Sequence, residues 1–233
     1  MDQEIALTYV RKRKRRKRAA IISGISAIGI TIFLIIAFCM LTVDRFTITI
    51  DQGPGLCLSI DEEKTETTTL LAAPPLLKAS DTQYTDIPEN IEDGIGSKNT
   101  DRYFAYSFYL GGVADNTNLI NYEMNMYLKD FSQDLEQAIK IMIIRNGTKR
   151  VYSQDGKAIY NEPNRQEETK EIIGYSIPFQ DNKHIILQPY SIVPGEFDKF
   201  TVVIWIDGWE SVNSMKGGTF QADLKFSTLS YNN

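Results

Sequence analysis

Residues 120–128 read INYEMNMYL, and the pattern of this stretch decides the fold class. Every second side chain is apolar or aromatic, and polar residues stand between most of them. Successive side chains of a β-strand point to opposite faces, so this pattern predicts a strand with one buried face. The predicted buried face consists of Ile120, Tyr122, Met124, Met126 and Leu128. The predicted exposed face contains Asn121, Glu123 and Asn125.

Strand signals continue on both sides of this stretch. Tyr103–Leu110 is an aromatic run, and Asn146-Gly147 is a strong hairpin signal. Phe200–Ile206, FTVVIWI, is apolar without alternation, which is typical of a central strand covered on both faces. About eight or nine short strands and almost no helix are expected, which predicts a mainly β fold, a jelly-roll-like antiparallel β-sandwich. Other predicted strands are Phe46–Ile50, Leu56–Ile60, Ile139–Arg145, Ile172–Ile177, Ile185–Gln188 and Thr219–Phe226.

Stretches rich in turn-forming residues separate the predicted strands. Residues 61–100 are rich in Thr, Asp, Glu, Ser and Pro, and we expect them to form mainly a surface connection. Residues 111–118, which begin with two glycines, and the polar residues 154–170 are predicted to be loops. We therefore expect residues 44–100 to hold short strands and the connection that joins the sandwich, and residues 101–233 to form its main part.

An uncharged stretch near the N-terminus predicts a membrane span. Residues 19–43 contain no charged side chain, and a helix of this length extends about 37 Å. The hydrocarbon core of a bilayer is about 30 Å thick. The sequence therefore predicts one transmembrane helix that precedes the sandwich.

The charge differs strongly between the two sides of this stretch. Residues 1–18 hold eight basic and two acidic residues, a net charge of +6, whereas the rest of the chain holds 17 basic and 28 acidic residues, a net charge of −11. The positive-inside rule then predicts a single-pass protein of the cell membrane with a cytoplasmic tail and an extracellular C-terminal domain. The tail is expected to contact anionic membrane lipid, and the acidic exterior argues against nucleic acid as a partner. The basic residues of the tail are Arg11, Lys12, Arg13, Lys14, Arg15, Arg16, Lys17 and Arg18.

Other interpretations of the N-terminal region fit the residues less well. A cleaved signal peptide has a shorter apolar region and a small-x-small cleavage site, and residues 38–43 offer no Ala-x-Ala. A lipoprotein cysteine at Cys39 is disfavoured because Phe38 precedes it where a small residue is expected. A nuclear-import role for the basic run is disfavoured because the run directly adjoins the apolar stretch.

The order of several segments resembles the TasA/camelysin-like surface proteins of Gram-positive bacteria. Residues 103–110, YFAYSFYL, resemble the family's aromatic strand, and residues 135–143, LEQAIKIMI, resemble its following element. Residues 194–205 and 217–226 resemble its Trp-containing strand and its closing strand. The resemblance implies a jelly-roll sandwich on the cell surface; its best-known members build biofilm-matrix fibres, and camelysin is described as a surface metalloprotease. After the Trp strand the family often has Asp-Pro-x-Cys, whereas this chain reads Gly-Trp-Glu-Ser from Gly208.

The residues offer little support for catalysis. His184 is the single histidine, and no His-Glu-x-x-His, Gly-x-Ser-x-Gly or phosphate-binding loop occurs. Calcium prefers oxygen ligands, but no EF-hand spacing organises the acidic residues, so we expect solvated loops and no cofactor. Cys57 is expected to be a small buried hydrophobe; a functional thiol or an intermolecular disulfide is the alternative. The acidic clusters are Asp61-Glu62-Glu63 and Asp86, Glu89, Glu92 and Asp93.

These observations favour a membrane-anchored structural or interaction protein of the cell surface. Its partners would be another surface protein or a second copy, met at strand edges. Three alternatives stay open: a metal-dependent surface peptidase, a fibre subunit released by cleavage, and a membrane-anchored sensor. We expect residues 46–60 to separate two cases, because strands that pair within their own chain close the domain, whereas unpaired strands are free for a neighbour.

Overall fold

The computed structural model describes residues 31, 46–51, 55–76, 78–113, 118–129, 131–161, 170–181, 184–186 and 189–229. All of these except Thr31 belong to one compact unit, Arg45–Asn233. Among the described residues, no helix has both the length and the apolar character needed to cross a bilayer. The predicted tail and, apart from Thr31, the predicted span lie outside the described residues, so both stay predictions.

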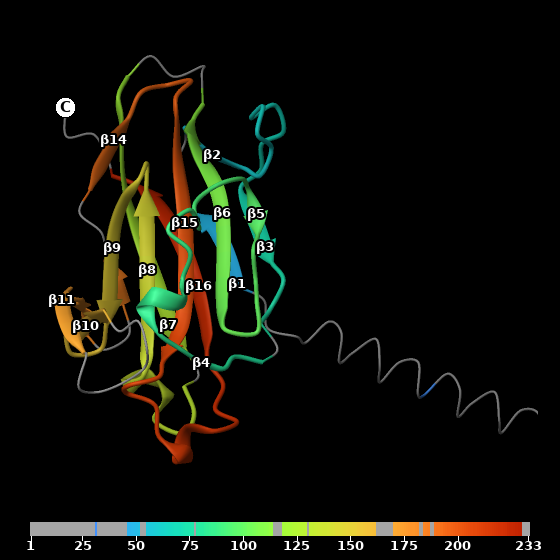
Figure 1. Cartoon of the computed structure of the whole chain (residues 1–233). Helices are drawn as coiled ribbons and strands as arrows, with labels where there is room; N and C mark the ends of the chain where they lie inside the picture. Colours follow the sequence, from blue (N-terminus) through green and yellow to red (C-terminus); the bar gives the residue numbers. More distant parts are fainter. Residues whose placement is uncertain are drawn as a thin grey trace, which may run out of the picture. The chain divides into compact units, whose positions relative to one another are not determined.

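The larger of two main sheets, sheet B, is built around the long strand β15 (Phe197–Asp207) (Figure 1). This strand pairs antiparallel with β6 (Tyr103–Gly112) on one side and with β8 (Ile139–Arg145) on the other. The chain turns from β8 into β9 (Thr148–Ser153) through Asn146 and Gly147, whose φ angles are 46° and 80°. Two positive φ angles are what a type I′ hairpin turn requires, so the predicted hairpin is confirmed. The outer strands are β2 (Leu56–Ser59), β4 (Asp81–Thr82), β5 (Gly96–Ser97) and β12 (Ile177–Pro178).

The second sheet, sheet A, contains the strand predicted from residues 120–128. The residues of β7 alternate between buried and half-buried positions from Ile120 to Leu128, which confirms the predicted buried face. The neighbouring strand β16 alternates in the same way, with Ala222, Leu224 and Phe226 buried. The strands of sheet A are β1 (Phe46–Ile50), β3 (Leu70–Ala73), β7 (Ile120–Lys129), β13 (His184–Ile186), β14 (Tyr190–Ile192) and β16 (Gln221–Thr228).

The inner faces of the two sheets pack together into one core, which makes the domain a β-sandwich. Three aromatic rings join the sheets at its centre: Phe108 and Phe200 come from sheet B, and Phe226 comes from sheet A. The ring centroids of Phe200 and Phe226 lie 5.2 Å apart in an edge-to-face arrangement. All three side chains are fully buried, and each such ring stabilises the fold by several kcal/mol, on the order of 3–5, relative to alanine.

A smaller apolar cluster covers the outer face of sheet B. Trp205 and Val203 of β15 point to this face and are buried by Ile87 and Ile91, which come from the connection before β6. The run FTVVIWI is thus covered on both faces, as its lack of alternation predicts. The connection 61–100 is more than a surface loop. Part of it, which includes the 3₁₀ turn η1 (Tyr84–Asp86), forms this cover, and strands β3, β4 and β5 join the sheets.

The first strand, β1, lies inside sheet A and not at its edge. It pairs antiparallel with β3 and parallel with β16, the last strand of the described chain. Its successor β2 belongs to sheet B, where it pairs with β6. The predicted strands 46–50 and 56–60 therefore form, but they lie in different sheets. The sandwich is mostly antiparallel, with further parallel pairs between β4 and β15 and between β9 and β12.

Two predicted loops are partly wrong. Gly111 and Gly112 do not form a turn, because they are the last two residues of strand β6. Glycine is needed at both positions because the ring of Phe197 and the carbonyl of Val193 approach so closely that a Cβ would not fit. Within residues 154–170, Ala158–Asn161 forms strand β10, which pairs with β11 (Glu171–Tyr175). Strand β14 was not predicted. Two short 3₁₀ turns, η2 (Leu135–Gln137) and η4 (Asn213–Met215), precede β8 and β16 respectively.

Candidate functional site: an arginine hollow at the open side of the sandwich

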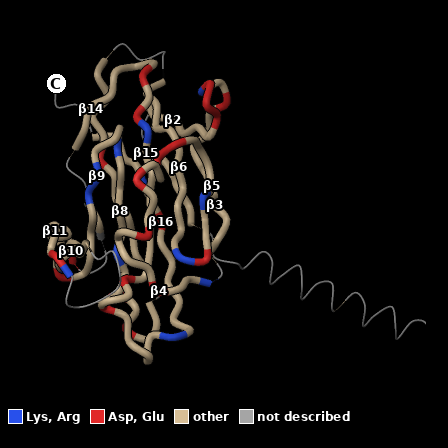
Figure 2. The backbone as a smooth tube through the Cα atoms, viewed as in Figure 1, with Lys and Arg blue, Asp and Glu red and all other residues tan. Residues whose placement is uncertain are grey.

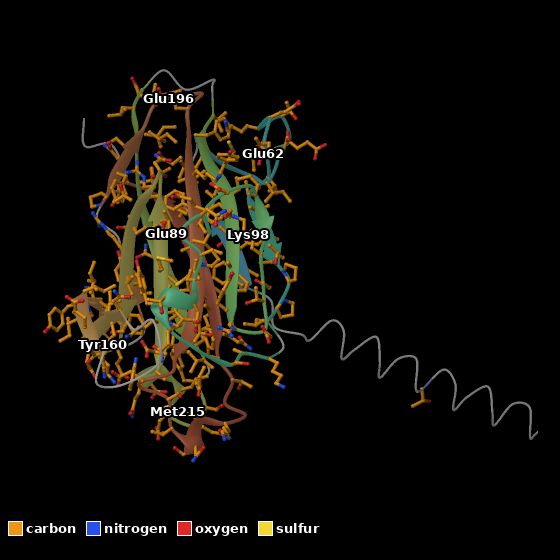
Figure 3. The ribbon with its side chains drawn as sticks, in the orientation of Figure 1. Glu62, Glu89, Lys98, Tyr160, Glu196 and Met215 are labelled. Atoms are coloured by element: carbon orange, nitrogen blue, oxygen red, sulfur yellow. The ribbon has the colours of Figure 1, made fainter. Side chains whose placement is uncertain are left out.

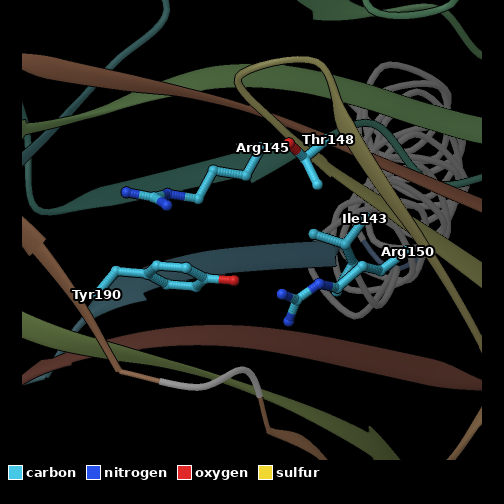
Figure 4. A pocket seen from close by; sticks show the side chains of 5 residues that line it. All are labelled: Ile143, Arg145, Thr148, Arg150 and Tyr190. Atoms are coloured by element: carbon cyan, nitrogen blue, oxygen red, sulfur yellow. The ribbon is translucent and has the colours of Figure 1, made fainter.

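A hollow of about 200 Å³ opens where β8, β9 and β14 meet (Figure 4). Two of these strands belong to sheet B and one to sheet A, so the hollow lies between the margins of the two sheets. Tyr190 of β14 forms one wall, and the hairpin of β8 and β9 forms the other. The residues that line the hollow are Ile143, Arg145, Thr148, Arg150 and Tyr190.

Strand register explains why two arginines line this hollow. Ile143 is directly opposite Arg150 across the β8–β9 pair, and Arg145 is opposite Thr148. Ile143 belongs to the core between the sheets, so residues at even spacing from it share this inner face. Both arginines therefore continue the core-facing side of sheet B towards the hairpin turn, where the sandwich opens to solvent.

The charge of Arg145 is matched by Asp198, an almost fully buried carboxylate on β15. Arg145 donates to Asp198 Oδ2 from Nη2 at 2.8 Å and from Nε at 3.1 Å. The hydroxyl of Tyr122, which comes from the other sheet, also donates to Oδ2. The amide of Asn146 donates to Oδ1 at 2.6 Å. Four donors thus converge on one carboxylate, which satisfies both of its oxygens.

Burial and these contacts fix the charge states of the network. Burial, reinforced by the hydrogen bond to Asp198, raises the pKa of Tyr122 far above its usual value, so its hydroxyl stays neutral at physiological pH. Burial opposes the charged form of Arg145, but its contacts with Asp198 and Tyr122 outweigh burial and raise the pKa. The guanidinium also lies 3.8 Å from the centroid of the Tyr190 ring, a favourable cation–π contact.

Arg150 differs from Arg145 in its partners. Among the described residues, no acidic side chain lies within ion-pair distance of its guanidinium. Its side chain is half-buried and hydrogen-bonds to Tyr152. Burial raises the pKa of Tyr152, and the hydrogen bond from Arg150 offsets part of this rise. Figure 4 shows the hydroxyl of Tyr190 pointing towards the guanidinium of Arg150. Because Asp198 offsets the charge of Arg145, the guanidinium of Arg150 is left without a counter-charge in the part of the chain that the structure describes.

Two residues of the acidic clusters, Asp61 and Asp86, have partners within the protein. Asp61 accepts hydrogen bonds from the backbone amides of Glu63 and Thr65 and from the Thr65 hydroxyl. These contacts, led by the hydroxyl, lower the pKa of Asp61 to about 2 and fold the loop between β2 and β3, shown in red in Figure 2. Asp86 pairs with Arg102 at 2.9 Å. Within the described ranges, no group of three or more His, Cys, Asp or Glu residues is placed to hold a metal ion.

The two other singled-out residues lie inside the sheets. Cys57 is a free, buried thiol that donates to the carbonyl of Gly111 over 3.6 Å, and burial raises its pKa. A buried protonated thiol is a poor nucleophile, which agrees with the prediction of a small buried hydrophobe. His184 begins β13, opposite Tyr127 of β7. The basic residues Arg11, Lys12, Arg13, Lys14, Arg15, Arg16, Lys17 and Arg18 lie outside the described residues.

A buried ion pair was also missed from the sequence. Lys140 of β8 and Asp207 of β15 form a salt bridge with both side chains almost fully buried. Lys140 Nζ also donates to the carbonyl of Ala158 at 2.8 Å, and Asp207 accepts from the backbone amide of Trp209 at 2.8 Å. The pair thereby attaches strand β10 to sheet B. Its position suits a structural role, because both charges are enclosed and matched.

No protein-family model and no curated protein matches this chain.

Proposed function

We propose that the chain is a membrane-anchored cell-surface interaction protein, with residues 19–43 as a transmembrane helix and the sandwich as an extracellular jelly roll. The observation that carries this proposal is the place of β1. The strand begins at Phe46 and is held inside sheet A between β3 and β16 of the same chain. Only Asp44 and Arg45 separate it from Val43, the last residue of the uncharged stretch.

The pairing of β1 bears on whether the sandwich needs a second copy of the chain to complete its sheets. A strand that pairs with its own chain on both edges completes the sheet without a neighbouring copy. The first strand, β1, therefore has both of its edges paired within its own chain. In addition, no long spacer separates the uncharged stretch from this strand. Both features favour a tethered domain that binds partners through its surface. They disfavour a subunit that assembles by exchanging its first strand with another copy.

The resemblance to TasA/camelysin-like proteins supports the same proposal. Its four segments fall on strands at the centre of the sandwich: residues 103–110 lie in β6, residues 135–143 span η2 and β8, residues 194–205 enter β15, and residues 217–226 enter β16. These strands supply Phe108, Phe200 and Phe226, the aromatic centre of the core. The matched positions are thus those that a shared sandwich fold would need.

The surface offers material for binding partners. Strand β11 exposes Ile172 and Ile173, each 50% accessible, and Tyr175, which is 70% accessible. Ile177 of β12, an outer strand of sheet B, is also exposed. Apolar side chains on outer strands are typical of surfaces that meet another chain. We place the binding role of the protein on the exposed apolar residues of β11 and β12 and on the arginine hollow.

The proposal is tested by the fate of the mature chain in cells. A C-terminally tagged chain is expected to stay in the membrane fraction after alkaline extraction, with an intact mass that includes residues 19–43. A tagged species in the culture medium that lacks these residues would contradict the tether and favour the released fibre subunit. The matched control replaces Ile30 and Leu34 by Lys, which should release the chain from the membrane because charges in a span are costly.

A further inference from the structure

We propose that the arginine hollow binds a single carboxylate group, with the guanidinium of Arg150 as its anchor. This inference rests on the proposed function in naming the chemistry of the partner, a carboxylate carried by a peptide or by a small molecule.

The charges around the hollow leave the guanidinium of Arg150 without a described counter-charge. Asp198 takes the charge of Arg145, Tyr122 stays neutral, and Arg150 has no acidic partner in the described part of the chain. A half-buried guanidinium without a counter-charge loses hydration, and its hydrogen bond to Tyr152 replaces only part of that loss. A monoanion in the hollow restores neutrality there, whereas the rest of the extracellular part is acidic overall.

Geometry selects the type of anion. A guanidinium presents a planar fork of donors that matches the two oxygens of a carboxylate. Thr148 and Tyr190 line the same hollow, and the hydroxyl of Tyr190 supplies a further donor that points towards Arg150. A phosphate monoester carries close to two charges at neutral pH and has three strong acceptor oxygens. The one guanidinium without an acidic partner in the described part of the chain therefore matches the single charge of a carboxylate better than the charge of a phosphate monoester.

The open margins beside the hollow give access to a free carboxylate and also to one carried by an extended peptide. Among the described residues, Thr148–Val151 of β9 pair only with β8, and β14 pairs only with β7. The margins of both strands beside the hollow thus leave backbone groups for an added strand. A peptide that lies along either margin would carry an acidic side chain into the hollow.

The test is a titration of the purified full-length chain in detergent micelles at low salt, with ¹⁵N-labelled arginine. The probes are acetate, acetyl-glutamyl-amide and inorganic phosphate. Acetate should shift the Nε–H signal of Arg150 in a saturable way, and more strongly than phosphate at equal concentration. Tighter binding of the glutamyl probe than of acetate assigns the site to peptides, and equal binding assigns it to small carboxylates; both results support the proposal.

The variant Arg150→Gln, followed through the Nε–H signal of Arg145 in the same hollow, should weaken acetate binding by about tenfold or more, because a charge-assisted hydrogen bond is lost. The matched control is Lys149→Gln, which removes the same charge one residue away on the other face of β9 and should leave binding unchanged. Arg150→Lys keeps the charge without the fork and should bind at an intermediate level. Equal losses in Arg150→Gln and Lys149→Gln, stronger binding of phosphate, or no saturable shift would each overturn the proposal. None of these results depends on the orientation of the chain in the membrane, so they are separate from the test of the tether.

Discussion

Tyr122 of sheet A donates a hydrogen bond to Asp198 of sheet B, and this contact connects the two sheets by a polar bond at the margin of their core. Arg145 completes the connection, with Nη2 at 2.8 Å from the same carboxylate oxygen. The core of the sandwich is otherwise apolar here, with Phe226 packed edge-on against Tyr122. Asp198 therefore supports both the joining of the sheets and the position of Arg145 in the hollow.

Replacing Asp198 by Ala should destabilise the domain markedly. The change leaves Tyr122, Arg145 and the Asn146 amide without their acceptor, and the expected cost is about 2–4 kcal/mol in the free energy of unfolding. The measurement is urea unfolding of the full-length chain followed by the fluorescence of Trp205 and Trp209. The control Lys129→Ala removes the half-exposed pair with Asp223 and should cost at most about 1 kcal/mol. Similar losses in both variants would contradict the role given to Asp198.

The buried pair of Lys140 and Asp207 should respond differently to single and double replacement. Lys140→Met leaves an uncompensated buried carboxylate and should cost about 3–5 kcal/mol in the free energy of unfolding. Adding Asp207→Asn removes that charge while keeping an acceptor for the Trp209 amide, so the double variant should regain part of the loss. The check is a double-mutant cycle from the same unfolding curves. Additive losses would show that the two side chains do not interact.

The loop between β2 and β3 should titrate at unusually low pH. The hydrogen bonds to Asp61 favour its ionised form and lower its pKa from 3.8 to about 2. Their contribution to loop stability is therefore complete above pH 3.8 and is lost as the pH falls through about 2. The amide signals of Glu63 and Thr65 should report this midpoint by NMR. In Thr65→Ala the midpoint should move up towards 3.8, because the Thr65 hydroxyl is the main cause of the shift. A wild-type midpoint near 3.8 would show that these bonds do not form.

Gly111 should tolerate alanine poorly. A Cβ at this position would lie 2.3 Å from Cε1 of Phe197, so the ring must leave its place against Tyr109. The expected loss is about 1–3 kcal/mol in the free energy of unfolding. In a Phe197→Ala background the same change should cost much less, because the obstructing ring is gone. An equal cost in both backgrounds would mean that the close approach is not the reason for glycine at this position.

Much of the fold follows from local patterns in the sequence. The alternation in β7 and β16 identifies their buried faces, and the unbroken apolar run in β15 identifies a strand covered on both sides. Asn146-Gly147 identifies a hairpin because few other residue pairs adopt two positive φ angles. These features depend on neighbours in sequence, so one sequence suffices to find them.

Pairings between distant segments could not be found in this way. Strands β1 and β2 look like the two arms of a hairpin, yet their partners β16 and β6 are distant in sequence. Strand β10 was missed because Ala158–Asn161 lies among polar residues and gains its order by pairing with β11 and by the bond from Lys140. Gly111 was interpreted as a turn because Phe197, whose ring requires glycine there, is distant in sequence.

The candidate site was missed for the same reason. Arg145 was seen as the end of a strand, and Asp198 only as part of a segment with a family resemblance. Their contact with Tyr122 joins β7 and β8, which lie in different sheets, to β15, which is distant from both in sequence. The one available signal was the inward register of Arg145 and Arg150 across the predicted hairpin, which places two charges on the face of Ile143.

The most direct test of the tethered surface protein is cysteine labelling in intact cells with a membrane-impermeant maleimide. Glu62→Cys places a thiol on an exposed side chain that points away from the sandwich (Figure 3), and Asp2→Cys places one in the basic tail. The wild-type chain is the control for its own two thiols: Cys57 is buried and protonated, and Cys39 belongs to the predicted span. We predict that the thiol at position 62 is labelled in intact cells and that the thiol at position 2 is labelled only after permeabilisation. Labelling of position 2 in intact cells, with position 62 protected, would contradict the account.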